Sequence, residues 1–391
     1  MDLDLSADEL RFRDEVRAWF DTHLVGEFAA HRGIGSATGV DDWDLQLRWE
    51  KELAADRLLN ITWPEEYGGR GGTLNQEIVF LLEFARVRAP YWVGVHGRDL
   101  FGPTLVRFGT PEQKARFLPP ITRAEEFWGQ GFSEPDAGSD LASLRTTAER
   151  RGDQWVVTGQ KIWMSLGMYA DWLYVLCRTD PDAPRHRGIS LLMVPRHQPG
   201  VEIRPIRNLA GGAEFCEVFL DGARTDADLV VGGVNNGWQV AMGTLGTERV
   251  LTTLPAQLGF PYELEELVDV VRGRGCARDP IVRQELVKAW IGLRVDQLAT
   301  ARTLAAVRRG HDPGAHASLS KLRWANWHRD FGALAMNLVG ADAMVAGDAD
   351  SRSNLQRVFL ESRAETIYGG ANEIQRNVVG ERLLDLPREP A

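Results

Sequence analysis

Cysteine is scarce in this chain, and long apolar runs are absent. The 391 residues include 3 cysteines, and Cys177, Cys216 and Cys276 are too widely separated for a disulfide framework or a CxxC metal site. No apolar stretch approaches the roughly 20 residues that span a bilayer, and the acidic first residues lack the pattern of a signal peptide. We therefore expect a cytoplasmic protein with no metal and no membrane segment.

Positive charge is in deficit as well. The chain carries 45 Lys and Arg against 55 Asp and Glu, a net charge of −10. This balance argues against nucleic acid as a partner, so a bound polyanion needs locally placed Arg side chains or backbone N–H groups. The sequence also lacks a G-x-G-x-x-G stretch that follows a strand and opens a helix. A doubly wound dinucleotide-binding domain is therefore not expected.

The apolar periodicity divides the chain into three parts. Residues 1–123 show helical spacing, 124–232 hold strand-like runs, and helical spacing returns over 233–391. This order, without alternation of strands and helices, indicates an α+β multidomain protein. An N-cap at Thr110 followed by Pro111 marks one helix start. Further helices are expected at about 43–59 and 74–87, and strands at about 155–163, 172–179, 189–194, 201–206 and 216–220.

A polar, glycine-bearing loop with the sequence SEPDAGSD occupies residues 133–140. Pro135 fixes one backbone angle, Gly138 permits a tight bend, and the serine hydroxyls donate or accept hydrogen bonds. Alone, the stretch is best interpreted as an ordinary turn. A second stretch, GQKIWMS at 159–165, ends a strand-like run in an aromatic residue and a hydroxyl. Together they favour a cradle for a planar cofactor with polar edges.

The two stretches resemble the S/T-E-P-x-A-G-S-D and G-x-K-x-W-I/M-T/S patterns of the acyl-CoA dehydrogenases. The similarity extends from WPEEYGG at 63–69 to YGGANEIQR at 368–376. The resemblance implies an N-terminal helical bundle (1–123), a central β-barrel-like domain on the flavin side (124–232) and a C-terminal four-helix bundle with the base (233–391). It also implies non-covalent FAD, an acyl-CoA substrate, an electron-transfer flavoprotein as acceptor, and a homotetramer or an α2β2 heterotetramer.

The same resemblance implies which residues bind the cofactor and the substrate. Asn337 and Gly340 stand where relatives contact the FAD pyrophosphate of a neighbouring subunit through a Gln before a Gly-Gly pair, a pattern that is not intact here. For Arg249 we favour a place in the CoA pocket, and the alternatives are a contact with a bound carboxylate network and packing of its aliphatic stem. The implied cofactor-binding residues are Phe132, Ser133, Ser139, Trp163, Ser165, Asn337, Gly340, Ala371 and Glu373, and the implied substrate-binding residues are Ser139, Arg249 and Tyr368.

The catalytic base is implied to be Glu248. In the medium-chain branch of the family a Glu directly follows a Tyr, but here Gly369 follows Tyr368. The isovaleryl-CoA and long-chain branches place the carboxylate in an earlier Glu-Arg pair, which corresponds to Glu248-Arg249, and the steroid side-chain dehydrogenases of actinobacteria resemble this chain in both respects. Gly369 then offers its N–H to the thioester oxygen. The alternative interpretation of Glu248 is a surface glutamate, and that of the segment with Gly369 is a turn that connects two helices.

We therefore expect FAD-dependent α,β-dehydrogenation of a branched, long-chain or steroid side-chain acyl-CoA to the trans-2-enoyl-CoA. The α-proton passes to Glu248 and the β-hydrogen leaves as hydride to flavin N5. One alternative is a non-catalytic or co-catalytic subunit of a heteromeric dehydrogenase. Another is a flavin oxidase or monooxygenase on the same fold. A carrier-protein thioester in place of CoA is also left open by the sequence.

Overall fold

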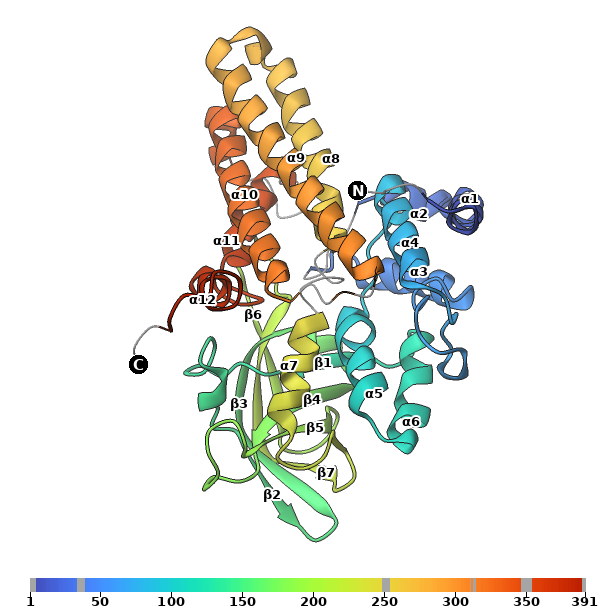
Figure 1. The fold of residues 1–391 in the computed structure, drawn as a ribbon, viewed down its shortest axis with the longest axis vertical. Helices are drawn as coiled ribbons and strands as arrows, with labels where there is room; N and C mark the ends of the chain where they lie inside the picture. The colour runs from blue at the N-terminus through green and yellow to red at the C-terminus, as the bar shows by residue number, and fades with distance from the viewer. Residues whose placement is uncertain are drawn as a thin grey trace. The chain divides into compact units, whose positions relative to one another are not determined.

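The structure, a computed structural model, describes residues 5–33, 39–247, 254–309, 311, 314–345 and 354–388. It divides into two compact units (Figure 1). The first contains helices and a β-sheet, and the second is helical, which confirms the predicted α+β multidomain fold. The predicted boundaries after residues 123 and 232 stay predictions. The first unit comprises Ala7–Asn208 and Gly212–Thr252, and the second comprises Met1–Ser6, Leu209–Gly211 and Thr253–Ala391.

The helices of the first unit begin and end at local signals. Thr110 and Gln113 form a capping box at the start of α6, where the sequence predicts an N-cap. Helix α3 ends at Ala55, earlier than expected, because Arg57 adopts a left-handed φ of 55° soon afterwards. These helices are α1 (Ala7–His23), α2 (Gly26–Ala30), α3 (Trp43–Ala55), α4 (Leu74–Val87), α5 (Gly102–Phe108), α6 (Pro111–Thr122) and α7 (Gly237–Thr247), with short turns η1 (Glu65–Tyr67), η3 (Leu141–Ser143) and η4 (Gly167–Tyr169) and a π-helix, η2 (His96–Phe101).

Strands within the described residues form one open, 8-stranded sheet. Its order is β6-β7-β3-β2-β4-β5-β8, and β1 pairs with β4 in parallel. The five expected strands are present, and β7 is longer than expected because it continues along β3 as far as Asp226. The strands are β1 (Trp128–Gly131), β2 (Thr147–Arg151), β3 (Gln154–Ser165), β4 (Trp172–Arg178), β5 (Ile189–Pro195), β6 (Val201–Ile206), β7 (Phe215–Asp226) and β8 (Val230–Val231).

Strand β4 is buried on both faces of the sheet. Leu173, Val175 and Cys177 point to one side and join a core made of strand residues. Tyr174 and Leu176 point to the other side and join a core that includes residues of η2, α5, α6 and α7. Figure 1 shows α7 lying across β4 and β5. The continuous apolar run of β4 follows from this two-sided burial.

The second unit is a helical bundle. Helices α8 to α11 lie side by side (Figure 1) and share a core that includes Phe260, Leu267, Trp324 and Leu355. This arrangement confirms the predicted C-terminal four-helix bundle. None of the helices in the described ranges combines the length and apolar composition needed to cross a bilayer. The elements are α8 (Leu254–Gly273), η6 (Cys276–Arg278), α9 (Pro280–Arg308), α10 (Ala315–Val339), η7 (Gly340–Met344), α11 (Asn354–Glu365) and α12 (Asn372–Leu383).

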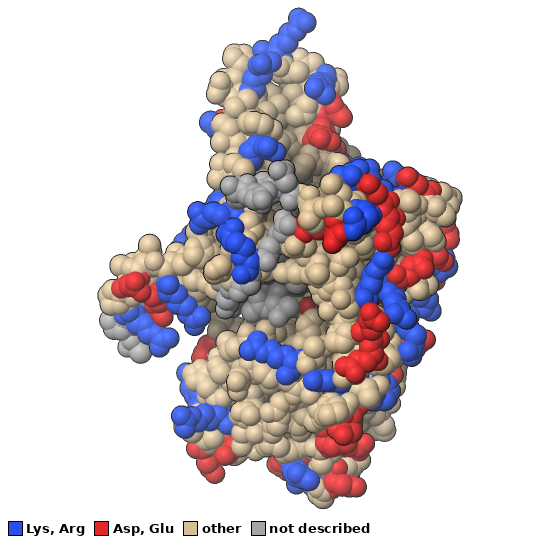
Figure 2. Space-filling model, turned by 45° about the vertical axis from the view of Figure 1, so that its right-hand side comes forward, with Lys and Arg blue, Asp and Glu red and all other residues tan. Residues whose placement is uncertain are grey.

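Charged side chains of both signs are interspersed on the face shown in Figure 2. Pairs such as Arg48–Glu27, at 2.9 Å, and Arg204–Glu202, at 2.7 Å, are exposed to solvent. Exposed ion pairs contribute about 0–1 kcal/mol each, since water screens them. The charges that fix the fold are therefore the buried ones.

A buried ion pair joins the SEPDAGSD loop to β3. The Nζ atom of Lys161, which is 0% exposed, donates to the Phe132 carbonyl at 3.0 Å and to Glu134 Oε1 at 2.7 Å. Glu134 also accepts from the backbone N–H groups of Arg145 and Thr146 at 2.6 and 2.9 Å. Burial alone raises the pKa of the Glu134 carboxyl, but Lys161 and these donors lower it below its usual range. Burial outweighs the neighbouring Glu134 and lowers the pKa of Lys161. The loop is thus anchored by a buried Lys161–Glu134 pair.

A buried histidine joins three helices of the second unit. His328 on α10 hydrogen-bonds through Nδ1 to Glu365 of α11 at 2.7 Å and through Nε2 to Glu263 of α8 at 2.8 Å. Its ring stacks on Phe260, with centroids 4.3 Å apart. Burial alone lowers the pKa of His328, but the two carboxylates outweigh burial and raise it to about 10. The ring is therefore an imidazolium that neutralises carboxylates on two neighbouring helices.

We predict that His328→Gln destabilises the protein in a pH-dependent way. Because the folded-state pKa lies above the unfolded value of 6.5, the stabilisation is fully present below pH 6.5 and is lost as pH rises through about 10. Losing the cation should lower the free energy of unfolding by about 3–5 kcal/mol at pH 6, and by less at higher pH. Urea unfolding at pH 6, 8 and 10 measures this.

The matched control is His316→Gln, because His316 lies exposed on the same helix. It should change the free energy of unfolding by less than about 0.5 kcal/mol at each pH. An equal loss for His328→Gln at all three pH values would contradict the charged state of His328.

We also predict that Lys161→Met destabilises the first unit by about 3–5 kcal/mol, because it leaves the Glu134 carboxylate buried without its cation. Adding Glu134→Gln should recover part of this loss. Arg151→Met is the control, since Arg151 pairs with Glu149 at an exposed position. Denaturant unfolding followed by tryptophan fluorescence tests the series, and a double variant less stable than Lys161→Met would argue against the ion pair as the cause.

Candidate functional site

The SEPDAGSD loop and the end of β3 form one piece of structure. The N–H of Ile162 donates to the Ser133 carbonyl at 3.0 Å, next to the Lys161 bonds to Phe132 and Glu134. Glu134 and Ala137 exchange two backbone hydrogen bonds of 3.0 Å, which close the turn of the loop. The hydrogen bonds therefore bring the two stretches together at Ser133 and at the Glu134–Lys161 pair, next to Trp163 in the sequence.

Trp163 sits at an irregularity in β3. The pairing of β3 with β7 shifts register between Lys161 and Met164, as at a β-bulge. Trp163 has a φ of 62°, a left-handed conformation that costs a bulky residue roughly 1–2 kcal/mol. The bulge turns its indole outward, where it is 59% exposed, with Phe215 edge-on at 6.3 Å. A strained, exposed aromatic beside Ser133 is typical of a ligand-binding position.

The other residues predicted in this region differ in exposure. Phe132 is 6% exposed and lies in the core that includes residues of η2 and α5. Ser133 and Ser165 are half-buried. Ser139 is exposed, next to Gly138, around which a Cβ would meet nothing within 4 Å. The loop thus has one buried end and one open end.

Strand β1 adds two donors that sequence reasoning missed. Among the described residues, the side-chain nitrogens Trp128 Nε1 and Gln130 Nε2 are buried and have no hydrogen-bond partner. Within the same ranges β1 pairs on one side only, with β4. Buried donors without a partner cost free energy. Trp128 lies in the core beside Phe101 and Phe117, whereas Gln130, close to the loop and half-buried, is a candidate donor for a ligand with polar atoms. The only signal in the sequence is a polar Gln130 between two glycines, directly before the loop.

The second unit holds the predicted turn after α11. Gly369 and Gly370 have φ values of 61° and 93°, which a side chain disfavours. Tyr368 is 37% exposed, and Ala371 is the N-cap residue of α12. Glu373 is exposed and pairs with Arg376 at 3.5 Å, so its carboxylate faces solvent in this chain.

Asn337 and Gly340 are not brought close to this turn. They lie at the C-terminal end of α10, where Gly340 is the C-cap with a φ of 68°. Lys321, which contacts the turn, lies sixteen residues before Asn337 on the same helix, about 24 Å away at 1.5 Å per residue. In the second unit of one chain, the predicted cofactor contacts at Asn337 and Gly340 therefore lie apart from those at Ala371 and Glu373.

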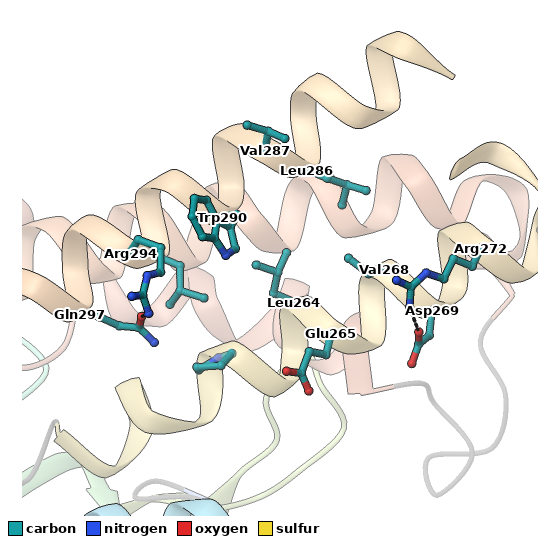
Figure 3. Close-up of a pocket in the computed structure, with 12 residues that line it drawn as sticks. Leu264, Glu265, Val268, Asp269, Arg272, Leu286, Val287, Trp290, Arg294 and Gln297 are labelled. Atoms are coloured by element: carbon teal, nitrogen blue, oxygen red, sulfur yellow. Dashed lines mark hydrogen bonds and ion pairs between the residues drawn. The ribbon is translucent and has the colours of Figure 1, made fainter. Parts of the chain in front are cut away.

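The predicted base and its neighbour, Glu248 and Arg249, lie outside the described residues. A groove of about 620 Å³ runs between α8 and α9 of the second unit. Figure 3 shows Leu264, Leu286 and Trp290 along it, with the Asp269–Arg272 pair at one end. None of the predicted site residues that the structure describes lines this groove. Within the described ranges, no cluster of three or more His, Cys, Asp or Glu side chains is arranged to hold a metal ion.

Comparison with known proteins assigns the whole chain. Family models for the N-terminal, middle and C-terminal domains of acyl-CoA dehydrogenase match residues 6–125, 129–223 and 235–384. Acyl-CoA dehydrogenase IpdE1 of Mycobacterium tuberculosis is 49% identical over 382 residues, which cover 97% of this chain and 98% of the relative.

Solved structures agree. The structure described as "Tcur3481-Tcur3483 steroid ACAD" has a TM-score of 0.87 and 30% identity, and the similarity covers 100% of both chains. The ChsE4-ChsE5 complex from Mycobacterium tuberculosis has a TM-score of 0.81 and 30% identity, again over 100% of both chains. These matches confirm the resemblance inferred from the two motifs. The chain belongs to the acyl-CoA dehydrogenase family, whose members are enzymes that dehydrogenate acyl-CoA thioesters.

Proposed function

We propose that this chain binds FAD without a covalent bond and dehydrogenates the acyl-CoA between Cα and Cβ. The observation that carries the proposal is the bulge in β3, which presents Trp163 beside Ser133 on a loop anchored by Lys161 and Glu134. An exposed indole, serine hydroxyls and an unpaired amide donor on Gln130 match a planar ring with polar edges. When bound, the flavin supplies an acceptor for the hydride that leaves Cβ.

Each predicted residue then has a part in binding. Phe132, Ser133, Trp163 and Ser165 hold the flavin ring, and Ser139, at the open end of the loop, contacts a phosphate or the substrate. In the second unit Ala371 and Glu373 contact the cofactor, and Tyr368 contacts the acyl group. Arg249 binds the CoA moiety.

The proton chemistry falls to two residues. Glu248 removes the α-proton as general base, and the N–H of Gly369 donates to the thioester oxygen as negative charge develops there. Support for Gly369 comes from its φ of 61°, since a glycine keeps the backbone open at that position. Support for Glu248 is the Glu-Arg pair of the sequence.

The substrate is proposed to be a branched, long-chain or steroid side-chain acyl-CoA. The structural relative at 30% identity is described as a steroid ACAD. With the base predicted at Glu248, position 369 is a glycine and has no side chain to crowd a branched Cα. Electrons are proposed to pass on to an electron-transfer flavoprotein.

A second chain is proposed to complete the site. Two of the relatives are named as pairs of chains, Tcur3481-Tcur3483 and ChsE4-ChsE5. Asn337 and Gly340 lie far along α10 from the Gly369 turn, as expected if they contact the flavin of another subunit. Helix α9 also exposes Trp290, at 54%, and Leu298, at 55%. We propose a homotetramer or an α2β2 heterotetramer on these grounds.

The cofactor proposal predicts a yellow protein. The supernatant after heat release should contain FAD by mass spectrometry, and Trp163→Ala should weaken its retention. Co-expression with a homologous chain from the same genome distinguishes an incomplete site from a wrong assignment. If the chain contains no flavin alone or with such a partner, the proposed function is wrong.

We predict that Glu248→Gln slows flavin reduction by about 10²–10⁴-fold, the usual loss of a general base, while FAD and acyl-CoA still bind. Anaerobic titration with isovaleryl-CoA, palmitoyl-CoA and cholan-24-oyl-CoA, followed by flavin bleaching, identifies the substrate and measures the rate. Glu285→Gln is the control, because Glu285 is a helical glutamate paired with Lys288 on the surface of α9. Wild-type reduction rates in Glu248→Gln would return Glu248 to a surface role, and rapid peroxide formation would indicate an oxidase.

A further inference from the structure

Two buried side chains hold the carbonyl groups of the Gly369 turn. Lys321, on α10 and 2% exposed, donates from Nζ to the Gly370 carbonyl at 2.8 Å. Gln375, on α12 and 1% exposed, donates from Nε2 to the carbonyls of Gly369 at 2.9 Å and Gly370 at 3.2 Å. Lysine is almost never buried to this extent unless it is bonded. The turn is therefore a built feature and not merely a break between α11 and α12.

Fixing the carbonyls also fixes the neighbouring N–H groups. The peptide bonds here are trans, so each N–H points away from the carbonyl of the same peptide unit. The carbonyl of Gly369 shares a peptide unit with the N–H of Gly370, and the carbonyl of Gly370 shares one with the N–H of Ala371. Both N–H groups thus point away from Lys321 and Gln375. Among the described residues, neither donates to another backbone group.

The contacts also polarise the turn. A carbonyl that accepts hydrogen bonds makes the N–H of its own peptide unit a stronger donor, and the effect is larger where water is excluded. The Gly370 carbonyl accepts two such bonds, one from an ammonium group, so the N–H of Ala371 gains most. Charge-assisted bonds are about twice as strong as neutral ones.

A side chain at the second glycine would displace Gln375. A Cβ added to Gly370 would lie 2.4 Å from Gln375 Nε2, so the amide would have to move, and the φ of 93° at Gly370 disfavours a side chain independently. The turn is closed by the N–H of Asn372, which donates to the Thr366 carbonyl at 3.1 Å. Gln375 and Lys321 thus set the orientation of the turn from one side, and its N–H groups face the other.

We propose that Lys321 and Gln375 are positioning residues for the dehydrogenation: they aim the N–H groups of Gly370 and Ala371 as donors for the thioester oxygen, in addition to the N–H of Gly369. The inference rests on the proposed role of Gly369. Lys321 and Gln375 touch neither substrate nor cofactor in it. Their effect reaches the reaction through the backbone of the turn, and it extends the donor set from one N–H to three.

The test is the carbonyl stretch of a bound thioester. The probe is trans-hexadec-2-enoyl-CoA or chol-22-en-24-oyl-CoA, whichever corresponds to the better substrate, with ¹³C at the thioester carbon. In the wild-type protein, isotope-edited infrared spectra should show a downshifted carbonyl band. Lys321→Met and Gln375→Met should each move the band toward its position in solution. Each should also slow flavin reduction by about 10–100-fold, a loss no larger than that caused by removing a direct oxyanion donor.

Conservative variants separate positioning from general stability. Lys321→Gln keeps a donor without the charge, so it should restore most of the downshift and of the rate. Lys288→Met, which removes an exposed lysine of the same unit, is the matched control. Dissociation constants for the CoA probe should change by less than about threefold in every variant. The reason is that the turn is proposed to stabilise the transition state more than the bound ground state.

The outcomes are distinct. If Lys321→Met and Gln375→Met keep the wild-type band and rate, the inference is wrong. The inference is also wrong if Lys321→Gln is as slow as Lys321→Met while the band is unmoved in both. Should Lys321→Met fail to fold, Gln375→Met and Lys321→Gln decide by the same two readouts. If the wild-type protein neither shifts the band nor reduces flavin with any of the thioesters, the proposed function fails instead.

Discussion

The arrangement of the candidate flavin site depends on one buried ion pair, between Lys161 and Glu134. The loop at 133–140 has little apolar surface of its own, so hydrophobic burial alone does not fix its path. Of four hydrogen bonds at the pair, one joins the two side chains, and three use backbone groups: the Phe132 carbonyl before the loop and the N–H groups of Arg145 and Thr146 after it. Because burying these charges is costly, any displacement of the loop would leave one of them unpaired. The pair therefore specifies a single loop position next to Trp163.

The second unit uses the same device. Lys161 donates to the carbonyl of Phe132, and Lys321 donates to the carbonyl of Gly370. Both lysines are almost completely buried, and both bind a backbone carbonyl in a segment predicted to touch cofactor or substrate. In each case a side chain from a regular element fixes an irregular segment. This arrangement gives rigid loops without requiring a regular hydrogen-bond ladder in the loops themselves.

Local signals in the sequence predicted much of the fold. Helix α4 and the strands β4 to β6 lie close to their expected places, because periodicity and caps are set by neighbouring residues. A break between α8 and α9 at 274–279 interrupts the helical spacing of 233–391, where Gly275 takes a φ of 73° and Asp279 caps the next helix. The loop motif marked the site, but the bulge at Trp163 follows from pairing with β7, some fifty residues further along, and no local pattern predicts it.

The site residues divide by the same rule. Ser133, Trp163 and Gln375 stand in the quoted motifs. Gln130 is marked by the absence of a partner among the described residues, and Lys321 by a partner 49 residues away. Gly369 stands where the medium-chain branch of the family has a Glu, so the turn has no carboxylate at this position. A turn with two successive left-handed residues, packed against Gln375, offers backbone donors at the expense of side chains. On the proposed assignment the base comes from another segment, the Glu-Arg pair at 248–249, so that the backbone of one segment and the side chain of another divide the two tasks.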